Sequence, residues 1–237
     1  GSPLGALDQS LWKAQKFLER AHITFQPGLN EDLAATALWG SQQVNLYPRA
    51  KYDGVFGMWY GKGPGVDRCG DVFKHANHAG ASKHGGVLVL AGDDHGAKSS
   101  TLPHQSDHQF SAAMLPVLYP SSVQEILVLG LHGWAMSRYS GCWVGFKCVA
   151  DTVESSSSVD IGTERSVLLR RGDARWYEGR CAAIAQVKRP APRQQERDDD
   201  RHESGGPAPA LIQGAELQAG AGQAMRVGLD HGARRPR

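Results

Sequence analysis

The chain has 237 residues, 41% of them hydrophobic, and a formal net charge of +2. This length suggests one domain with an extension or two small domains, and the near-neutral charge gives no support for binding nucleic acid or an anionic membrane surface. No apolar run reaches the roughly 18 residues that a membrane-spanning helix needs. The first residues, GSPLGALDQ, carry no signal-peptide pattern and no initiator Met, so we expect a processed chain or a fragment.

In chain order, helical and strand-like patterns alternate up to about residue 161. Helices are expected over residues 4–20, 30–44, 66–79 and 121–139, where apolar residues recur near a helical period. Strands are expected over residues 23–26, 53–60, 86–92, 116–118 and 142–149, several of which are continuous apolar runs. A glycine-rich turn over 61–65 and a long polar loop over 93–107 lie between these elements.

This alternation predicts an α/β fold with a doubly wound parallel sheet, because parallel strands need helical crossover connections. Such sheets bind ligands at the carboxyl ends of their strands. The turns at Gly28, Gly61 and Gly92 all follow predicted strands at that edge. We therefore expect these three turns to meet at one site.

The composition changes after residue 161. Residues 188–237 are rich in Arg, Gly, Ala, Pro and Gln and show no strand pattern. Such a segment buries too little apolar surface to offset the entropy of ordering. We therefore divide the chain into a domain over 1–161 and a disordered C-terminal tail over 162–237. The abrupt change near residue 162 is also typical of an out-of-frame reading of a GC-rich gene.

The four cysteines, Cys69, Cys142, Cys148 and Cys181, include no C-x-x-C pair. Zinc and iron–sulfur sites take closely spaced ligands, so neither is expected within this chain. In the absence of a signal peptide, the cysteines are predicted to be reduced core thiols of a cytoplasmic protein.

Glu31 is a candidate catalytic carboxylate at the start of the second predicted helix. Asn30 before it is a good N-cap, and the helix dipole favours a carboxylate in the first turn. Residue types alone leave two readings open, a helix-starting glutamate without further function and a functional carboxylate on a rigid element.

The turn at Gly61–Gly65, GKGPG, lies between a strand and a helix, where anion-binding loops occur. It lacks both standard fingerprints, because Val66 replaces the last glycine of the dinucleotide pattern and Gly63 follows Lys62 where a P-loop has Ser or Thr. A tight turn without a ligand remains the alternative.

The loop over 92–108, GDDHGAKSSTLPHQSDH, is the densest polar stretch of the chain. Its possible metal ligands are Asp93, Asp94, His95, His104, Asp107 and His108. They include no i, i+4 histidine pair on a helix, so a metal-dependent hydrolase is a minor alternative and no metal ligand is predicted. Ser99 and Ser100 lie outside a G-x-S-x-G elbow, which disfavours a serine nucleophile. The length of the loop favours a lid over substrate or cofactor.

Several long motifs of residues 1–161 resemble one known family. The segments FQPGLNEDLAATALWGSQQV, GVLVLAGDDHGAKSSTLPHQSDH and SGCWVGFKCVADTVESSSSVD are similar to the N-terminal part of indolepyruvate ferredoxin oxidoreductases, which belong to the 2-oxoacid:ferredoxin oxidoreductases. The resemblance implies a thiamine diphosphate enzyme that converts arylpyruvates such as indolepyruvate to aryl-acyl-CoA, with ferredoxin as electron acceptor and coenzyme A as co-substrate.

The resemblance also implies roles for single residues. Residues 1–161 would be the pyrimidine-binding domain, in which Glu31 contacts N1′ of the aminopyrimidine and thereby promotes removal of the thiazolium C2 proton. Gly61, Lys62 and Gly63 are further candidates for cofactor contact.

Substrate contacts are expected from two other segments. Ser2 matches a small hydroxyl motif that lines the family's substrate site. Lys98, Ser99 and Ser100 match the family's active-site loop.

Parts of the family pattern are missing from this chain. The Mg²⁺–diphosphate motif, G-D-G with a later Asn, is absent because no Asn follows Asn77, and the cluster-binding cysteines are absent too. Mg²⁺ and iron–sulfur clusters would therefore belong to the complete enzyme, and a diphosphate-binding domain or subunit would be the partner. The strand that precedes GSPLG in the family is also missing, so one sheet position is expected to be unpaired.

Two readings thus remain. The chain is part of an oxidoreductase and inactive alone, or it is a non-catalytic α/β interaction module or a pseudogene-like remnant.

Overall fold

The computed structural model describes residues 3–161, 210–214 and 223–225. Its helices are α1 Gly5–Lys13, α2 Gln15–Arg20, α3 Glu31–Gln42, α4 Gly63–Arg68, α5 Gly70–Ala79, α6 Asp107–Ala112, α7 Val123–Ser140 and α8 Ala150–Val153, with a 3₁₀ turn at Val44–Leu46. Its strands are β1 Ile23–Gln26, β2 Phe56–Lys62, β3 Gly86–Asp93, β4 Val117–Leu118, β5 Val144–Val149, β6 Ala210–Gly214 and β7 Gln223–Met225.

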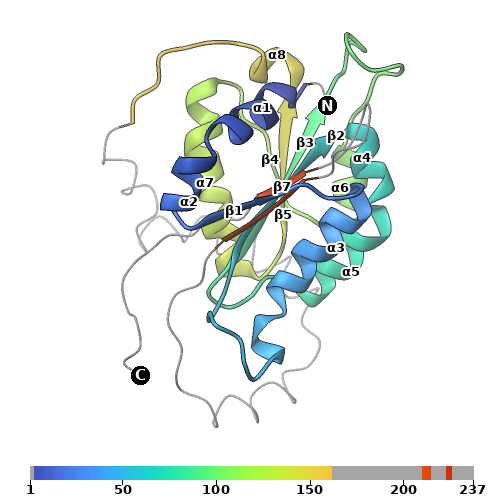
Figure 1. Cartoon of the computed structure of the whole chain (residues 1–237). Coiled ribbons are helices and arrows are strands. Elements are labelled where there is room, and N and C mark those ends of the chain that lie inside the picture. The colour runs from blue at the N-terminus through green and yellow to red at the C-terminus, as the bar shows by residue number, and fades with distance from the viewer. Residues whose placement is uncertain (1–2, 162–209, 215–222, 226–237) are drawn as a thin grey trace.

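The described strands form one sheet in the order β1-β6-β7-β2-β3-β5-β4. β2, β3, β5 and β4 pair in parallel. Helices α1, α2 and α7 cover one face of the sheet, and α3, α4, α5 and α6 cover the other (Figure 1). The predicted doubly wound α/β fold is therefore confirmed.

The central strand β3 explains why the sheet is covered on both faces. Val87 and Val89 point into the apolar cluster beneath α3 and α5, which contains Trp59 and Phe73. The alternate residue Leu88 points into the cluster beneath α1 and α7. A strand with apolar residues at every position must bury both faces, which is why its sequence reads as a continuous apolar run.

Most predicted elements are present, but two predicted helices are broken. The helix expected over 4–20 is interrupted at Ala14, and the helix expected over 66–79 is interrupted at Cys69. The second begins earlier, at Gly63, so the predicted turn over 61–65 is instead the end of β2 and the first turn of α4. Pro64 fits there because the first helical turn leaves its backbone N–H groups unbonded.

Two short segments of the predicted tail lie in the sheet. β6 pairs in parallel with β1, and β7 pairs antiparallel with β2, so both lie between β1 and β2. The expected unpaired sheet position is thus occupied in the described part of the chain. Backbone groups alone supply these hydrogen bonds, so a segment can pair without a strand-like side-chain pattern. The rest of the predicted tail, 162–209, 215–222 and 226–237, lies outside the described residues.

Three of the cysteines, Cys69, Cys142 and Cys148, are free and buried, as predicted, whereas Cys181 lies outside the described residues. Burial, with the nearby charge of Asp93, raises the pKa of Cys148 to about 12, which makes its thiol unreactive at neutral pH. Within the described ranges, no helix combines the length and the apolar character needed to cross a membrane.

Asn77 on α5 joins three elements of the buried layer. Its side-chain nitrogen donates to the carbonyl of Ala113 at 2.7 Å, and its oxygen accepts from the backbone N–H of Trp143 at 3.0 Å. The Asn77 side chain therefore fixes the end of α6 and the approach to β5 against α5.

We predict that Asn77→Ala lowers the free energy of unfolding by about 2–3 kcal/mol, because a buried carbonyl and a buried N–H lose their partners. Urea denaturation followed by circular dichroism measures this loss. Lys74→Ala, at an exposed position of the same helix, should stay within about 0.5 kcal/mol of the parent. Equal losses in both variants would contradict the assigned role of Asn77.

Candidate functional site

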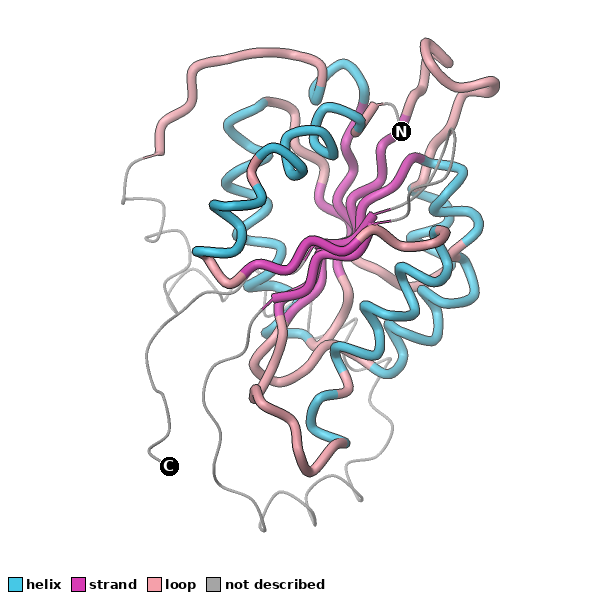
Figure 2. Tube along the Cα trace, viewed as in Figure 1, coloured by secondary structure: helices cyan, strands magenta, loops and turns pink. Residues whose placement is uncertain are grey.

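The connections that follow β1, β2 and β3 meet around the short helix α4. α3 follows β1, α4 follows β2, and a loop over 94–106 follows β3. Figure 2 shows this loop projecting beyond the end of β3, near α4. The connections thus come together on α4, but through Glu31 and His104; of the three predicted turns, Gly61 and Gly92 are strand residues and Gly28 packs on Ala34.

Glu31 begins α3 and is 4% exposed. The side chain of Asn30 accepts a hydrogen bond from the N–H of Leu33 at 2.8 Å, which is the predicted N-cap. The indole N–H of Trp59 donates to the carbonyl of Glu31 at 3.2 Å. The helix start is therefore fixed both by its own cap and by a strand of the sheet.

The carboxylate of Glu31 lies against α4. A Cβ atom at Gly65 would be 2.9 Å from Glu31 Cγ, so glycine is required for this approach. Arg68 Nε is 3.6 Å from Glu31 Oε2, which is an ion pair but longer than a hydrogen bond. No described residue donates a hydrogen bond to the Glu31 carboxylate, whose side chain is 6% exposed; the fully enclosed carboxylate oxygen without a partner is Oδ1 of the neighbouring Asp32. Glu31 therefore retains unused capacity to bind a donor.

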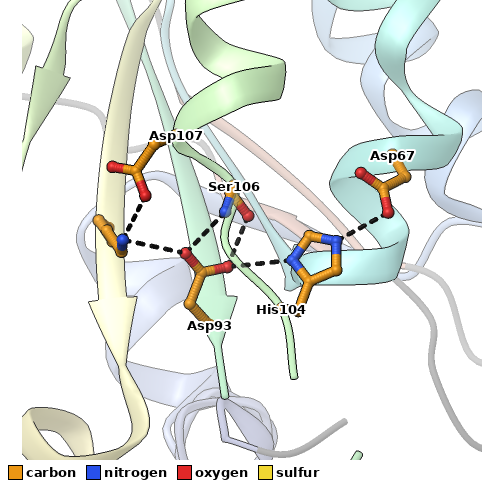
Figure 3. Close-up of polar contacts among 6 residues, drawn as sticks. Asp67, Asp93, His104, Ser106 and Asp107 are labelled. Atoms are coloured by element: carbon orange, nitrogen blue, oxygen red, sulfur yellow. Dashed lines mark hydrogen bonds and ion pairs between the residues drawn. The ribbon is translucent and has the colours of Figure 1, made fainter. Parts of the chain in front are cut away.

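Asp93 is a second carboxylate at the same edge, at the end of β3, and is fully buried. Ser106 donates to it twice, from its backbone N–H at 2.9 Å and from its hydroxyl at 2.6 Å (Figure 3). Lys147 of β5, which is also buried, lies 3.7 Å from Asp93 and bonds to Asp107 as well. Both oxygens of the Asp93 carboxylate therefore have partners, and Asp93 holds the end of the loop that leads into α6.

His104 lies between buried Asp93 and exposed Asp67. Its Nε2 is 2.7 Å from Asp67 Oδ2 on α4, and its Nδ1 is 3.5 Å from Asp93 Oδ1 (Figure 3). A Cβ atom at Gly63 would lie only 1.9 Å from His104 Nδ1, so the imidazole occupies the space that glycine leaves. His104 therefore connects the loop to the first turn of α4.

Asp94 organises the start of the loop. The backbone N–H groups of Ser99 and Lys98 donate to its carboxylate at 2.8 and 2.9 Å, and the Ser99 hydroxyl donates at 3.1 Å. These hydrogen bonds, with a further one from the backbone of Ser100, hold the pKa of Asp94 below its usual value. Lys98 also pairs with Asp151 of α8. These hydrogen bonds to the ionised Asp94 carboxylate therefore hold the start of the loop in place.

Burial alone would raise the pKa of Asp107, but the hydrogen bond and charge of Lys147 lower it overall. Asp107 is therefore an ionised partner of buried Lys147, as a buried ammonium group requires.

The predicted site residues fall into separate contact groups. Glu31 contacts α4, whereas Lys98 contacts Asp94 and Asp151. Gly61 and Lys62 are strand residues paired with β3, and Gly63 packs on the ring of His104. Ser2 lies outside the described residues, and no contact here tests a substrate role for Ser100.

Sequence reasoning missed the partners that complete the site. Asp67 and Lys147 carried no recognised motif, although a lysine inside the apolar run CWVGFKCV was a signal of a buried ion pair. Among the described residues, no group of three or more His, Cys, Asp or Glu side chains could hold a metal ion. Of the candidate ligands in the polar loop, Asp93, Asp94 and Asp107 instead bond to Ser, His and Lys side chains or to backbone N–H groups, whereas His95 Nε2 is buried without a hydrogen-bond partner among the described residues.

The fold and this edge define a doubly wound α/β protein with a carboxylate-rich site at the carboxyl ends of its strands. No family model matches the chain, and no solved structure matches it. Two curated relatives are similar in sequence, both named indolepyruvate oxidoreductase subunit IorA. The protein from Methanothermobacter marburgensis is 28% identical over 138 residues, covering 58% of this chain, and that from Methanothermobacter thermautotrophicus is 26% identical over 145 residues, covering 61%.

These relatives confirm, at low identity, the resemblance to indolepyruvate oxidoreductases found in the sequence. The matched regions are 20% and 22% of the two relatives, so the chain spans about a fifth of their length. Both relatives are named as subunits.

We predict that Gly63→Ala destabilises the protein by about 1–3 kcal/mol, because the new Cβ displaces the His104 ring from a packed position. Gly40→Ala is a matched control on α3, where a Cβ atom meets nothing within 4 Å. That control should stabilise the helix by about 0.5–1 kcal/mol. Urea titrations of both variants measure the two changes in the free energy of unfolding, which should have opposite signs. Stabilisation by Gly63→Ala would contradict the packing described.

The Asp94 cap predicts a dependence of stability on pH. Because the pKa of Asp94 is lower in the folded state than its usual 3.8, its stabilisation is complete above that value and is lost as pH falls through the folded pKa. Urea midpoints from about pH 6 to about pH 3 should fall less steeply in Asp94→Asn than in the parent. Glu19→Gln, at an exposed position of α2, should keep the parental slope, and so should Asp94→Asn if the hydrogen bonds to Asp94 are absent.

Proposed function

We propose that residues 1–161 form the pyrimidine-binding domain of a thiamine diphosphate-dependent enzyme that oxidatively decarboxylates arylpyruvates such as indolepyruvate. Glu31 is the residue proposed to contact N1′ of the aminopyrimidine. The observation that carries this proposal is a buried carboxylate, fixed at the start of α3, that accepts no hydrogen bond from the described residues.

The chemistry of Glu31 fits an aminopyrimidine. N1′ of such a ring is an acceptor that becomes a donor when protonated, so a carboxyl group can share a proton with it. Arg68 is 59% exposed at its side chain, and its Nε lies 3.6 Å from the carboxylate, which leaves room for exchange of partners. Displacing an exposed arginine costs little, because surface ion pairs contribute only about 0–1 kcal/mol.

Thiamine diphosphate, when bound, supplies a thiazolium carbon that attacks the keto group and stabilises the negative charge after decarboxylation. The part of Glu31 is to hold the shared proton at its carboxylate and to fix the orientation of the ring. Trp59 supports it, because the hydrogen bond from Trp59 to the Glu31 carbonyl prevents the helix start from moving away from the sheet. Gly61, Lys62 and Gly63 are proposed to line the cofactor side.

Substrate contacts are proposed for Ser2, Lys98, Ser99 and Ser100. Lys98, Ser99 and Ser100 are ordered around Asp94 at the start of a loop that begins directly after the sheet edge. A cation and hydroxyl groups there suit the carboxylate of a 2-oxoacid.

The remaining functions are proposed to lie in partner domains or subunits. Because the chain spans about a fifth of the relatives' length, we assign the Mg²⁺–diphosphate site to such a partner. Iron–sulfur clusters, ferredoxin and coenzyme A are likewise assigned to the complete, cytoplasmic enzyme. The isolated chain is proposed to be inactive.

A non-catalytic interaction module is the second candidate. α7 exposes Leu127 and Leu131, and an apolar cavity of about 520 Å³ lies between α1, α7 and the sheet. These features favour contact with another protein surface, which the catalytic proposal also requires. The two candidates therefore differ only in the role of Glu31.

We predict that Glu31→Gln slows exchange of the cofactor C2 proton at least about 100-fold in the complete enzyme, because the amide cannot share a proton with N1′. Proton NMR in deuterium oxide measures the exchange. Glu19→Gln, at an exposed position of α2, should exchange at the parental rate. Normal exchange in Glu31→Gln would remove Glu31 from the mechanism and favour the interaction module.

A further inference from the structure

α4 lies between the two groups of the candidate site. On one side, Gly65 and Arg68 contact Glu31. On the other, Gly63 packs against the ring of His104, and Asp67 bonds to its Nε2 at 2.7 Å. α4 has six residues, and a helix this short is not stable through its own hydrogen bonds. Its position therefore comes from its surroundings: Val66 of α4 is buried in the core cluster with Trp59 and Phe73, and the contacts with Glu31 and His104 hold the two sides of the helix.

We infer that His104 is a positioning residue for Glu31, acting through α4. The hydrogen bond between His104 and Asp67 fixes α4 against the sheet edge, and α4 in turn places Gly65 and Arg68 on the carboxylate. This role rests on the proposed function of Glu31 for its catalytic meaning, but the mechanical coupling is a property of the chain itself.

His104 is anchored to the rigid part of the molecule. Its Nδ1 faces Asp93, which is the last residue of β3 and is held by Ser106 and by Lys147 of β5. A buried carboxylate with these partners is difficult to displace, because its ionised form would lose them together. Through His104, Asp93 therefore fixes α4 relative to the sheet.

The charges around His104 make this coupling depend on its protonation. Asp67 of α4 and Asp93 of β3 face the two ring nitrogens directly, and Lys147 of β5 and Asp107 of α6 lie behind Asp93. A neutral imidazole has one N–H and donates to one carboxylate, whereas the imidazolium donates to both. The coupling is therefore tighter when His104 is protonated.

Trp59 provides a signal for the coupling, because its indole N–H donates to the carbonyl of Glu31. The experiment uses the full chain labelled with ¹⁵N, recorded at several pH values between about pH 5 and about pH 8. The Trp59 indole resonance of the parent should shift with pH over this range. Hydrogen exchange of the backbone amides over 63–69 is measured on the same samples.

Two variants and a control separate positioning from general stability. His104→Ala should displace the Trp59 resonance, remove its pH dependence and speed exchange over 63–69 about tenfold, the effect of losing one charge-assisted hydrogen bond. His104→Gln keeps a donor to Asp67 and should restore slow exchange without restoring the pH dependence. His78→Ala, at an exposed position of α5, should leave both signals unchanged.

Asp67→Asn tests the same contact from the exposed side and covers the case in which His104→Ala does not fold. It should reduce the pH-dependent shift of Trp59 by at least half. The inference is overturned if either folded variant changes only residues 94–106 and leaves Trp59 and 63–69 as in the parent. Neither signal needs a cofactor, so a failure of Glu31→Gln to alter C2 proton exchange would remove the proposed function and leave the coupling intact.

Discussion

The burial of Asp93 is the constraint on which the edge of the sheet depends. A carboxylate at the end of the central strand is shielded from water, and such a group needs compensating donors or cations. Ser106 and Lys147 supply them from two directions. Because Ser106 stands at the far end of the loop after β3, satisfying Asp93 closes that loop. The start of α6 is thereby fixed as well.

The same constraint accounts for the sequence of α4. Once the loop is closed, His104 projects over the end of β2, and a side chain at position 63 would occupy the space of its ring. Glycine at 65 is required for a different reason, since Glu31 approaches from α3. In the run GKGPG, Gly63 and Gly65 therefore leave room for the side chains of His104 and Glu31. These glycines admit neighbouring groups and are not needed for unusual backbone angles.

Whether the sequence predicts a feature of this molecule depends on how far apart in the chain the interacting residues lie. Strands β1 and β3 and the N-cap at Asn30 depend on neighbouring residues, and periodicity or capping rules identify them. The breaks at Ala14 and Cys69 depend on packing against the sheet, and no local signal marks them. Lys147 and Asp107 are 40 positions apart, so their pairing is a product of the fold. Lys147 could have been suspected, because an unpaired lysine is not stable inside an apolar strand.

The two buried carboxylates differ in a way that separates structure from function. Asp93 is surrounded by donors and a cation, so its charge is already used to hold the loop. Glu31 is slightly more exposed than Asp93, and its carboxylate has only a long contact to an exposed arginine among the described residues. Folding alone would favour replacing such a group by an apolar residue or giving it a donor. An incompletely satisfied carboxylate is therefore more naturally explained by a ligand that donates to it than by a role in helix initiation. α4, which covers Glu31, is held by Val66 in the core and on its outer side by the hydrogen bond between its Asp67 and His104, so the Glu31 carboxylate lies beneath a helix that is fixed on both sides.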